Sequence, residues 1–201
     1  MSEPDPEPPT TASSVAATGS GGVGRLPLVV ATLGALLAVV VVLLVLREGE
    51  PDPVEVAEPA GTSRLEDLSA EEACQSLGFR LPETLAGRSA RDVVGSDGGS
   101  APSGTAAWGD PPLVVTCGVD RPARLNAASE VVETGGVQVF VERRDDGGDR
   151  VTVVDRPVYV QLDAPPEISA GDAVQGLAEA VVGALPETPL DLPDAPATPD
   201  G

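Results

Sequence analysis

Hydrophobic residues form one long uninterrupted run near the start of the chain and shorter, periodic runs after residue 63. The long run, Leu26–Leu46, has 21 residues without a charge and is bracketed by Arg25 and Arg47. As a helix that rises about 1.5 Å per residue it would reach about 31 Å, which matches the hydrocarbon core of a bilayer. The pattern therefore predicts one transmembrane helix.

A cleaved signal peptide is the alternative interpretation of this run. Signal peptides have a shorter apolar region and a small-x-small cleavage site after it, which residues 47–50 do not provide. We therefore predict an uncleaved, single-pass anchor over residues 25–47 in the plasma membrane. One Arg on each side gives the positive-inside rule no preference. The C-terminal part is placed outside the cell because both cysteines lie there and an acidic, Pro-rich stretch follows the anchor.

Three segments beside the anchor and the domain are polar and rich in Pro, Gly or acidic residues, a composition that favours disorder. We predict a disordered cytoplasmic tail (1–24), an extended stalk (48–62) and a second disordered tail (186–201). Gly19–Gly24 matches G-x-G-x-x-G, but no strand precedes it and no amphipathic helix follows, so a dinucleotide site is rejected. The folded domain then covers residues 63–185.

Two stretches of this domain have the period of amphipathic helices. Ser69 and Glu72 have the spacing of a capping box at the start of the first, and Gly78 stands where a C-terminal cap is expected. The second stretch follows Ser169 and ends before Pro186. Its apolar stripe consists of Val174, Leu177, Val181 and Leu185.

Between the helices the period changes to two, which is typical of strands with one buried face. The predicted strands are Leu113–Val119, Val131–Glu133, Val137–Val141, Val151–Val154 and Val158–Leu162. Residues 81–107 are predicted to be a loop with a low-complexity, mobile stretch. The fold class is therefore α+β: a small, mostly antiparallel sheet of four to five strands with two helices, preceded by one transmembrane helix.

The chain has two cysteines, Cys74 on the first predicted helix and Cys117 on the inward face of the first predicted strand. An even count in a domain placed outside the cytoplasm favours a disulfide bond. A redox pair and half of a metal site are the alternatives, but the spacing is not C-x-x-C and the chain has no His. We predict a structural disulfide, which would stabilise a core that has few aromatic residues.

Composition excludes several classes of function. The chain has no His and no Lys, which removes Ser-His-Asp and Cys-His catalysis, the usual zinc sites, Schiff bases and the P-loop lysine. A net charge of −20 argues against nucleic acid and against an anionic membrane surface as partners. We predict no cofactor, no metal site and no catalytic residue, although glycoside chemistry stays open because Asp and Glu are abundant.

One stretch, Ala107–Pro122, has Trp-Gly-Asp-Pro followed by Cys-Gly-Val and resembles the signature of the domain of unknown function 3515 family. The earlier Cys74, the Leu-Pro pair at 81–82 and the Arg156–Val160 segment agree with this resemblance, which covers most of residues 70–185. The resemblance implies a membrane-anchored protein of high-GC Gram-positive bacteria, and it implies no activity.

The chain departs from the family pattern at two positions. Val139 stands where the family has Trp, and Thr116 stands where an Arg often precedes the Cys-Gly pair. If these positions belong to a ligand surface, that surface is altered in this chain.

Four residues near these motifs are candidates for a ligand-facing surface: Trp108, Asp110, Arg121 and Arg156. Trp108 could be an exposed stacking platform, although packing over the disulfide as the one large core residue is the favoured interpretation. Asp110, Asp120 and Arg121 flank the cysteine strand and could line a polar pocket with Arg156, or form surface ion pairs. A calcium site is not favoured at the turn, because its residues lack calcium-loop spacing: Asp145, Asp146 and Asp149.

These patterns establish no biochemical activity. The leading interpretation is a non-enzymatic envelope module that binds a partner protein or a cell-wall component. The alternatives are a cell-wall hydrolase with two carboxylates about 5–10 Å apart across a cleft, and an extracytoplasmic sensor. Small residues spaced four apart, such as Ala31 and Ala35, could seat a helix dimer, but the sequence does not fix the oligomeric state.

Overall fold

The computed structural model describes residues 36–42 and 51–194, and the chain divides into two units, 1–50 and 51–201, which are considered separately. Residues 36–42 are helical with exposed side chains. Within the described ranges, no helix is long and apolar enough to cross a membrane. Most of the predicted anchor Leu26–Leu46, and all of the predicted cytoplasmic tail, lie outside the described residues, so both remain predictions.

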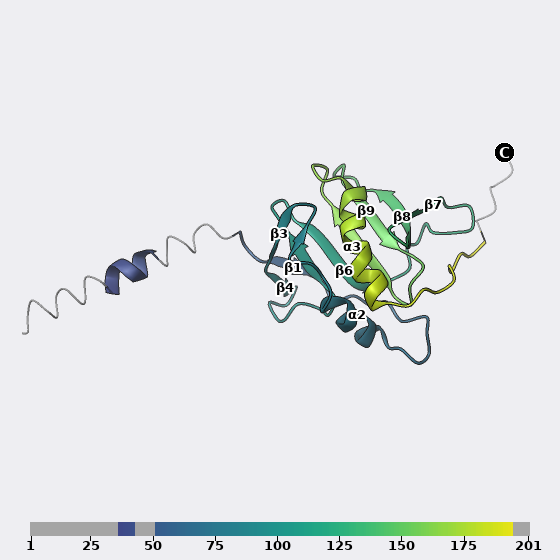
Figure 1. Ribbon diagram of the computed structural model, residues 1–201, viewed down its shortest axis with the longest axis horizontal. Helices are drawn as coiled ribbons and strands as arrows, with labels where there is room; N and C mark the ends of the chain where they lie inside the picture. The colour runs from purple at the N-terminus through teal and green to yellow at the C-terminus, as the bar shows by residue number, and fades with distance from the viewer. Residues whose placement is uncertain (1–35, 43–50, 195–201) are drawn as a thin grey trace, which may run out of the picture. The chain divides into compact units, whose positions relative to one another are not determined.

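The second unit has an α+β fold in which two helices pack on one face of a long sheet (Figure 1). The predicted fold class is confirmed at this level. In chain order the elements are β1 Val54–Val56, α2 Ala70–Gly78, β2 Thr84–Leu85, β3 Arg88–Arg91, β4 Val93–Gly95, β5 Ala106–Trp108, β6 Leu113–Val119, β7 Val131–Thr134, β8 Val137–Arg143, β9 Asp149–Val153, β10 Tyr159–Ala164 and α3 Ala170–Ala184.

The main sheet has eight strands in the order β2-β3-β5-β6-β10-β9-β8-β7, and each neighbouring pair is antiparallel. β1 and β4 form a separate parallel pair. The sheet is larger than the four to five strands predicted, because β2, β3 and β5 come from residues 81–107, which were expected to be a loop. These strands are two to four residues long, and the sequence of β3, Arg-Ser-Ala-Arg, has no apolar alternation that would identify it.

Both helices begin where the sequence predicts. In α2 the Ser69 hydroxyl accepts the Glu72 backbone N–H at 3.2 Å, and the Glu72 carboxylate accepts the Ser69 N–H at 3.1 Å, which completes a capping box. Hydrogen bonds from Ser69 hold the pKa of Glu72 below its usual value because they favour the charged form. The Ser169 hydroxyl caps α3 by accepting the Asp172 backbone N–H at 3.3 Å.

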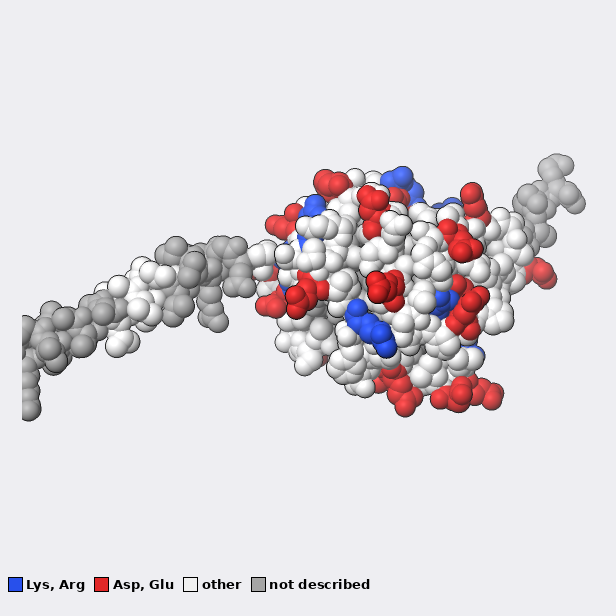
Figure 2. Space-filling view, viewed as in Figure 1, with Lys and Arg blue, Asp and Glu red and all other residues white. Residues whose placement is uncertain are grey.

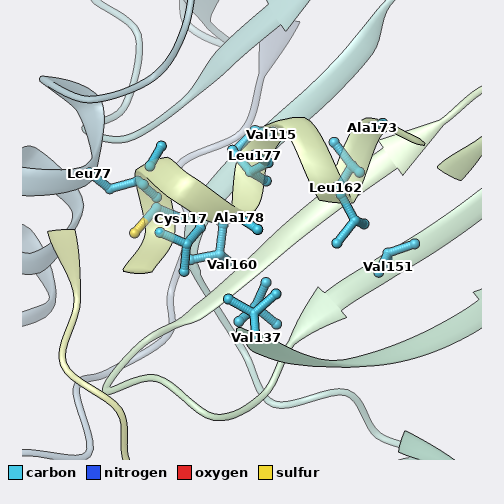
Figure 3. Close-up of a cluster of buried hydrophobic side chains, with 14 of the residues drawn as sticks. Leu77, Val115, Cys117, Val137, Val151, Val160, Leu162, Ala173, Leu177 and Ala178 are labelled. Atoms are coloured by element: carbon cyan, nitrogen blue, oxygen red, sulfur yellow. The ribbon is translucent and has the colours of Figure 1, made fainter. Parts of the chain in front are cut away.

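The core lies between α3 and the sheet, with α2 at one end. Figure 3 shows Leu177 and Ala178 of α3 close to the strand residues Val115 and Val160. Almost every large side chain of this cluster is Val or Leu, and Trp108 is the one large aromatic residue in it. At roughly 1.5–3 kcal/mol for each fully buried aliphatic side chain, this apolar interface is the main stabilising term.

The predicted disulfide is confirmed: Cys74 of α2 is bonded to Cys117 of β6. The chain is packed so tightly around it that position 104 requires glycine. Gly104 has φ +68°, and a Cβ there would lie 2.7 Å from both the Cys117 Cβ and the Cys74 carbonyl oxygen. The bond therefore joins the helix layer to the sheet at a point where the backbones are in close contact.

Both ends of the described domain are more ordered than the sequence predicts. Residues 51–62, expected as part of a stalk, include β1 and continue along β6, where the Gly61 N–H donates to the Gly118 carbonyl at 2.8 Å. Residues 186–194, expected as part of a disordered tail, pack on the domain, with the Thr188 N–H donating to the Asp155 carbonyl at 2.8 Å. Pro-rich segments of this kind form few backbone hydrogen bonds within themselves. Their order therefore depends on contacts with the rest of the domain, which their own sequence does not show.

Candidate functional site

The sheet has one face under the helices and one face turned away from them, which we call the outer face. On β6, Val115 and Cys117 point toward the helices, so Val114 and Thr116 belong to the outer face. On β10 the same alternation places Gln161 and Asp163 there. β6 and β10 are neighbours, and Thr116 is directly opposite Gln161. Four side chains of the outer face therefore form one patch at the middle of the sheet.

This patch is the floor of an open groove of about 650 Å³, which we call the outer groove. One wall is the segment 54–60, which precedes α2 in the chain. The rim also includes the Pro111-Pro112 turn, which follows Trp108 and Asp110 of the signature motif, and Arg144 and Asp146 of the β8–β9 hairpin. The groove thus combines a rigid floor with walls from three separate parts of the chain.

The N-terminal wall is held in place by backbone contacts. The Val54 N–H donates to the Asp92 carbonyl at 2.9 Å, and the Val56 carbonyl accepts the Ser96 N–H at 3.0 Å. Gly61 follows the wall, and a Cβ at this position would collide with the Val119 carbonyl oxygen. The segment 54–60 is therefore a fixed part of the folded domain.

The floor is organised around Asp163. Its carboxylate accepts two hydrogen bonds from Arg150, at 2.8 and 3.1 Å, and one from Gln161 at 3.0 Å. The hydrogen bond to Asp163 raises the pKa of Arg150, so this guanidinium is firmly charged. Arg144 lies 3.6 Å from Asp163 and 2.7 Å from Asp146, and it links the floor to the hairpin.

The lining has more acidic than basic groups. Arg144 is the one basic residue in it, and the acidic residues are Glu55, Glu58, Asp120, Asp146 and Asp163. Since Asp163 and Asp146 are already paired, the remaining carboxylates give the groove a negative potential. Such a surface favours ligands with ammonium or guanidinium groups.

The candidate residues from the sequence lie in different environments. Trp108 is completely buried in the cluster that contains both cysteines, and its indole N–H donates to the Pro82 carbonyl at 2.9 Å. The Asp110 side chain is 75% exposed and lies 3.8 Å from Arg91. Arg121 donates to the Leu125 carbonyl at 2.7 Å. The structure thus gives these residues different partners. None of them lines the outer groove, but Pro111 next to Asp110 and Asp120 next to Arg121 do.

Arg156 belongs to a buried polar cluster on the outer face, made of Arg64, Asp155, Arg156, Tyr159 and Thr188. Arg156 is 2% exposed and forms an ion pair with Asp155 at 2.8 Å. Burial raises the pKa of Asp155, while the adjacent Arg156 lowers it. Arg64 donates to the Arg156 carbonyl and to the Thr188 hydroxyl, and it stacks over the Tyr159 ring with its Cζ 5.1 Å from the ring centroid. The cluster joins the two ends of the domain and is closed to ligands.

Asp155 and the acidic turn at residues 145–149 have ionisable groups that are already engaged in ion pairs. Asp155 has the raised pKa that a general acid needs, but it is buried and paired with Arg156. In the part of the chain that the structure describes, no group of three or more candidate ligands could hold a metal ion. Arg143 and Arg144 pair with Asp149 and Asp146, respectively, the residues of the turn considered for calcium.

Sequence reasoning missed Gln161, Asp163 and Arg144 as candidate residues. The alternation along Val158–Leu162 contained a usable signal, because Gln161 is polar at a position that faces away from the core. The two departures from the family pattern have clear places: Thr116 lies on the floor of the outer groove, and Val139 is 3% exposed under α3.

Comparison with curated proteins found no match, and comparison with solved structures found none either. A family described as "Protein of unknown function (DUF3515)" matches residues 29–190, which include the signature strand, both cysteines and the outer groove. The chain therefore belongs to the DUF3515 family.

Proposed function

We propose that this protein is a single-pass membrane protein whose domain lies outside the cytoplasm and binds, without catalysis, an extended basic segment of another envelope protein. The outer groove is the observation that supports this most, since its lining has five acidic residues against one Arg. Its volume of about 650 Å³ is within the range typical of ligand sites, roughly 300–1,000 Å³.

The position of the floor supports recognition by side chains. β6 pairs with both β5 and β10, and β10 pairs with both β6 and β9, so the backbone groups of these strands are already used. A ligand on this floor meets the Thr116 hydroxyl, the Gln161 amide and the carboxylates around them. Because both strands lie inside the sheet, these groups are preorganised, which lowers the entropic cost of binding.

Two features support the proposed location. Leu26–Leu46 has the length and apolar character of a transmembrane helix. The Cys74–Cys117 disulfide lies in the domain that follows, and disulfides form and persist mainly in oxidising compartments.

Thiol labelling of intact cells tests the location. With a membrane-impermeant maleimide and no denaturant, we expect no labelling of Cys74 or Cys117 before reduction and slow labelling after it. The two thiols are buried, at 4% and 0% exposure, so they react only when the reduced domain opens. The native chain has no other cysteine, so it needs no engineered site. Labelling that appears only after lysis in denaturant, and without reductant, would place the domain in the cytoplasm with free thiols and overturn this part of the proposal.

Photo-crosslinking in native membranes tests the groove. A benzoylphenylalanine in place of Glu58, on the exposed wall, should give one discrete adduct with an envelope protein, and the crosslinked peptide should contain Lys or Arg. The matched control places the same probe at Phe79, which is 85% exposed at the end of α2. Adding Gln161→Arg to the Glu58 probe should reduce the adduct at least about tenfold, since a cation then occupies the floor.

Two results would contradict the proposal. One is an equal adduct from the Phe79 probe, because that position is not in the groove. The other is an adduct that persists unchanged with Gln161→Arg while the melting temperature of this variant equals that of the wild type.

A further inference from the structure

The two edges of the main sheet differ in a way that matters for binding. One edge strand, β2, has only two residues, which is a common protection against unwanted pairing. The other edge strand, β7, has four residues, contains no Pro, and within the described ranges pairs only with β8. One side of β7 therefore presents backbone N–H and C=O groups that no described segment pairs with.

An apolar groove of about 440 Å³ lies beside this edge on the helix face of the sheet, and we call it the edge groove. Val132 of β7 and Val141 of β8 line it together with Val174 and Ala170 of α3. Val132 is 47% exposed and Val141 46% exposed, which is high for valines inside strands. An open edge and an exposed apolar groove thus occur together.

A third valine extends the exposed apolar surface. Val182 of α3 is 48% exposed, and its side chain lies beside the β7–β8 turn at Gly136. This combination fits the mode in which an extended peptide adds a strand to a sheet edge, with main-chain hydrogen bonds for affinity and alternate side chains in a pocket for specificity.

Charge selects the kind of partner. β7 contains Glu133 and is preceded by Glu130, and Figure 2 shows acidic side chains, in red, spread over the domain with few Arg between them. If a second copy paired through its own β7, these carboxylates would face each other, and like charges across a strand pair are destabilising. A strand with basic side chains would instead be attracted.

We propose that β7 is a strand-addition site for an extended segment of another protein, with apolar side chains at alternate positions in the edge groove and a basic side chain on the outer face near Glu133. Val132 points into the edge groove and Glu133 points to the opposite face, so a segment that alternates valine and lysine satisfies both surfaces. This site does not depend on the outer groove, which lies on other strands.

The test uses the full chain and a fluorescent eight-residue peptide of alternating valine and lysine. We expect saturable binding by anisotropy and slower hydrogen exchange at Val131–Thr134 when the peptide is bound. Val132→Lys, which places a charge at the groove, should weaken binding at least about fivefold. Glu133→Lys should weaken binding of this peptide and improve binding of a peptide that alternates valine and glutamate, a reversal that a purely structural role of Glu133 would not produce.

Two control variants separate this site from the rest of the acidic surface. Glu66→Lys makes the same charge change at an exposed position outside the sheet and should leave peptide binding unchanged. Gln161→Arg alters only the outer groove and should also have no effect.

The proposal is overturned if binding is insensitive to both Val132→Lys and Glu133→Lys, or if exchange protection appears outside β7. It is also overturned if the free protein forms a dimer that Val132→Lys abolishes, because the occupant of the edge would then be a second copy.

Discussion

Replacing Cys74 and Cys117 together with alanine should lower the free energy of unfolding by about 4 kcal/mol. The bond closes a loop with a sequence separation of 43 residues, and opening this loop gives the unfolded chain conformational freedom that the bond removes. Since small domains have a total stability of about 5–15 kcal/mol, the loss is a large part of the whole. The cysteines are also buried, at 4% and 0% exposure, so smaller side chains add a packing cost.

Urea denaturation of the full chain, followed by circular dichroism, measures this effect. Reduction of the wild type should cause most of the same loss without any substitution. Gln75→Ala, at an exposed position of the same helix, is the matched control, with an expected change within about 0.5 kcal/mol. A double variant whose urea midpoint equals that of the oxidised wild type would show that the loop is already constrained in the unfolded chain.

Sequence patterns were sufficient to predict the helix starts and the long strands. The capping box at Ser69 and Glu72, the stripe along α3 and the alternation along β6 each depend on residues that are close in sequence. Helix caps and periodic apolar faces are properties of single segments, so the helix starts and the long strands could be placed without tertiary information.

The short strands of residues 81–107 could not be predicted, because their order comes from their neighbours. β5 pairs with β6 through residues such as Ala107 opposite Val114, and β3 then pairs with β5. A strand of two to four residues has too little apolar surface to be stable alone. It becomes a strand only because β6 offers an edge, and that information lies elsewhere in the chain.

The candidate site, too, could be predicted only in part from the sequence. Asp163 and Arg150 form a floor pair because β9 and β10 place them opposite each other, a register that composition does not reveal. For Trp108 the sequence favoured packing in the core over an exposed platform, and the position of β5 beside β3 and β6 gives its complete burial.

The buried Arg residues were the least predictable feature. Arg is usually exposed, and in a chain with a net charge of −20 each Arg would be expected to pair with surface carboxylates. Arg64 instead joins the C-terminal segment to the β9–β10 connection, since it donates to the Pro189 carbonyl at 2.7 Å and to the Arg156 carbonyl. Arg156 donates to the Gly136 carbonyl of the β7–β8 turn at 2.7 Å. The order of residues 186–194 thus depends in part on Arg64, through Thr188 and Pro189.

Replacing Arg156 with alanine should destabilise the domain by about 3–5 kcal/mol at pH 7, because Asp155 then keeps a buried charge without its partner. Arg143→Ala is the matched control. It breaks a pair with Asp149 whose Arg side chain is 70% exposed, so its cost should be under about 1 kcal/mol. Urea midpoints of the three proteins at pH 7 give the comparison.

The pH dependence then identifies the cause. Burial raises the pKa of Asp155, so the folded state holds this proton more tightly than the unfolded state, and the contribution of Asp155 to stability is present at low pH and lost as the pH rises through the folded-state pKa. Without Arg156 the pKa of Asp155 rises further, since Arg156 is the group that lowers it most. The cost of Arg156→Ala should therefore shrink as the pH falls, while a cost that came only from lost packing would stay constant.

A double variant separates the ion pair from the hydrogen bond that Arg156 makes. Asp155→Leu combined with Arg156→Met should recover most of the stability at pH 7, because neither side chain then leaves a buried charge. A double variant as unstable as Arg156→Ala would show that the hydrogen bond from Arg156 to Gly136, rather than the ion pair, stabilises this end of the sheet.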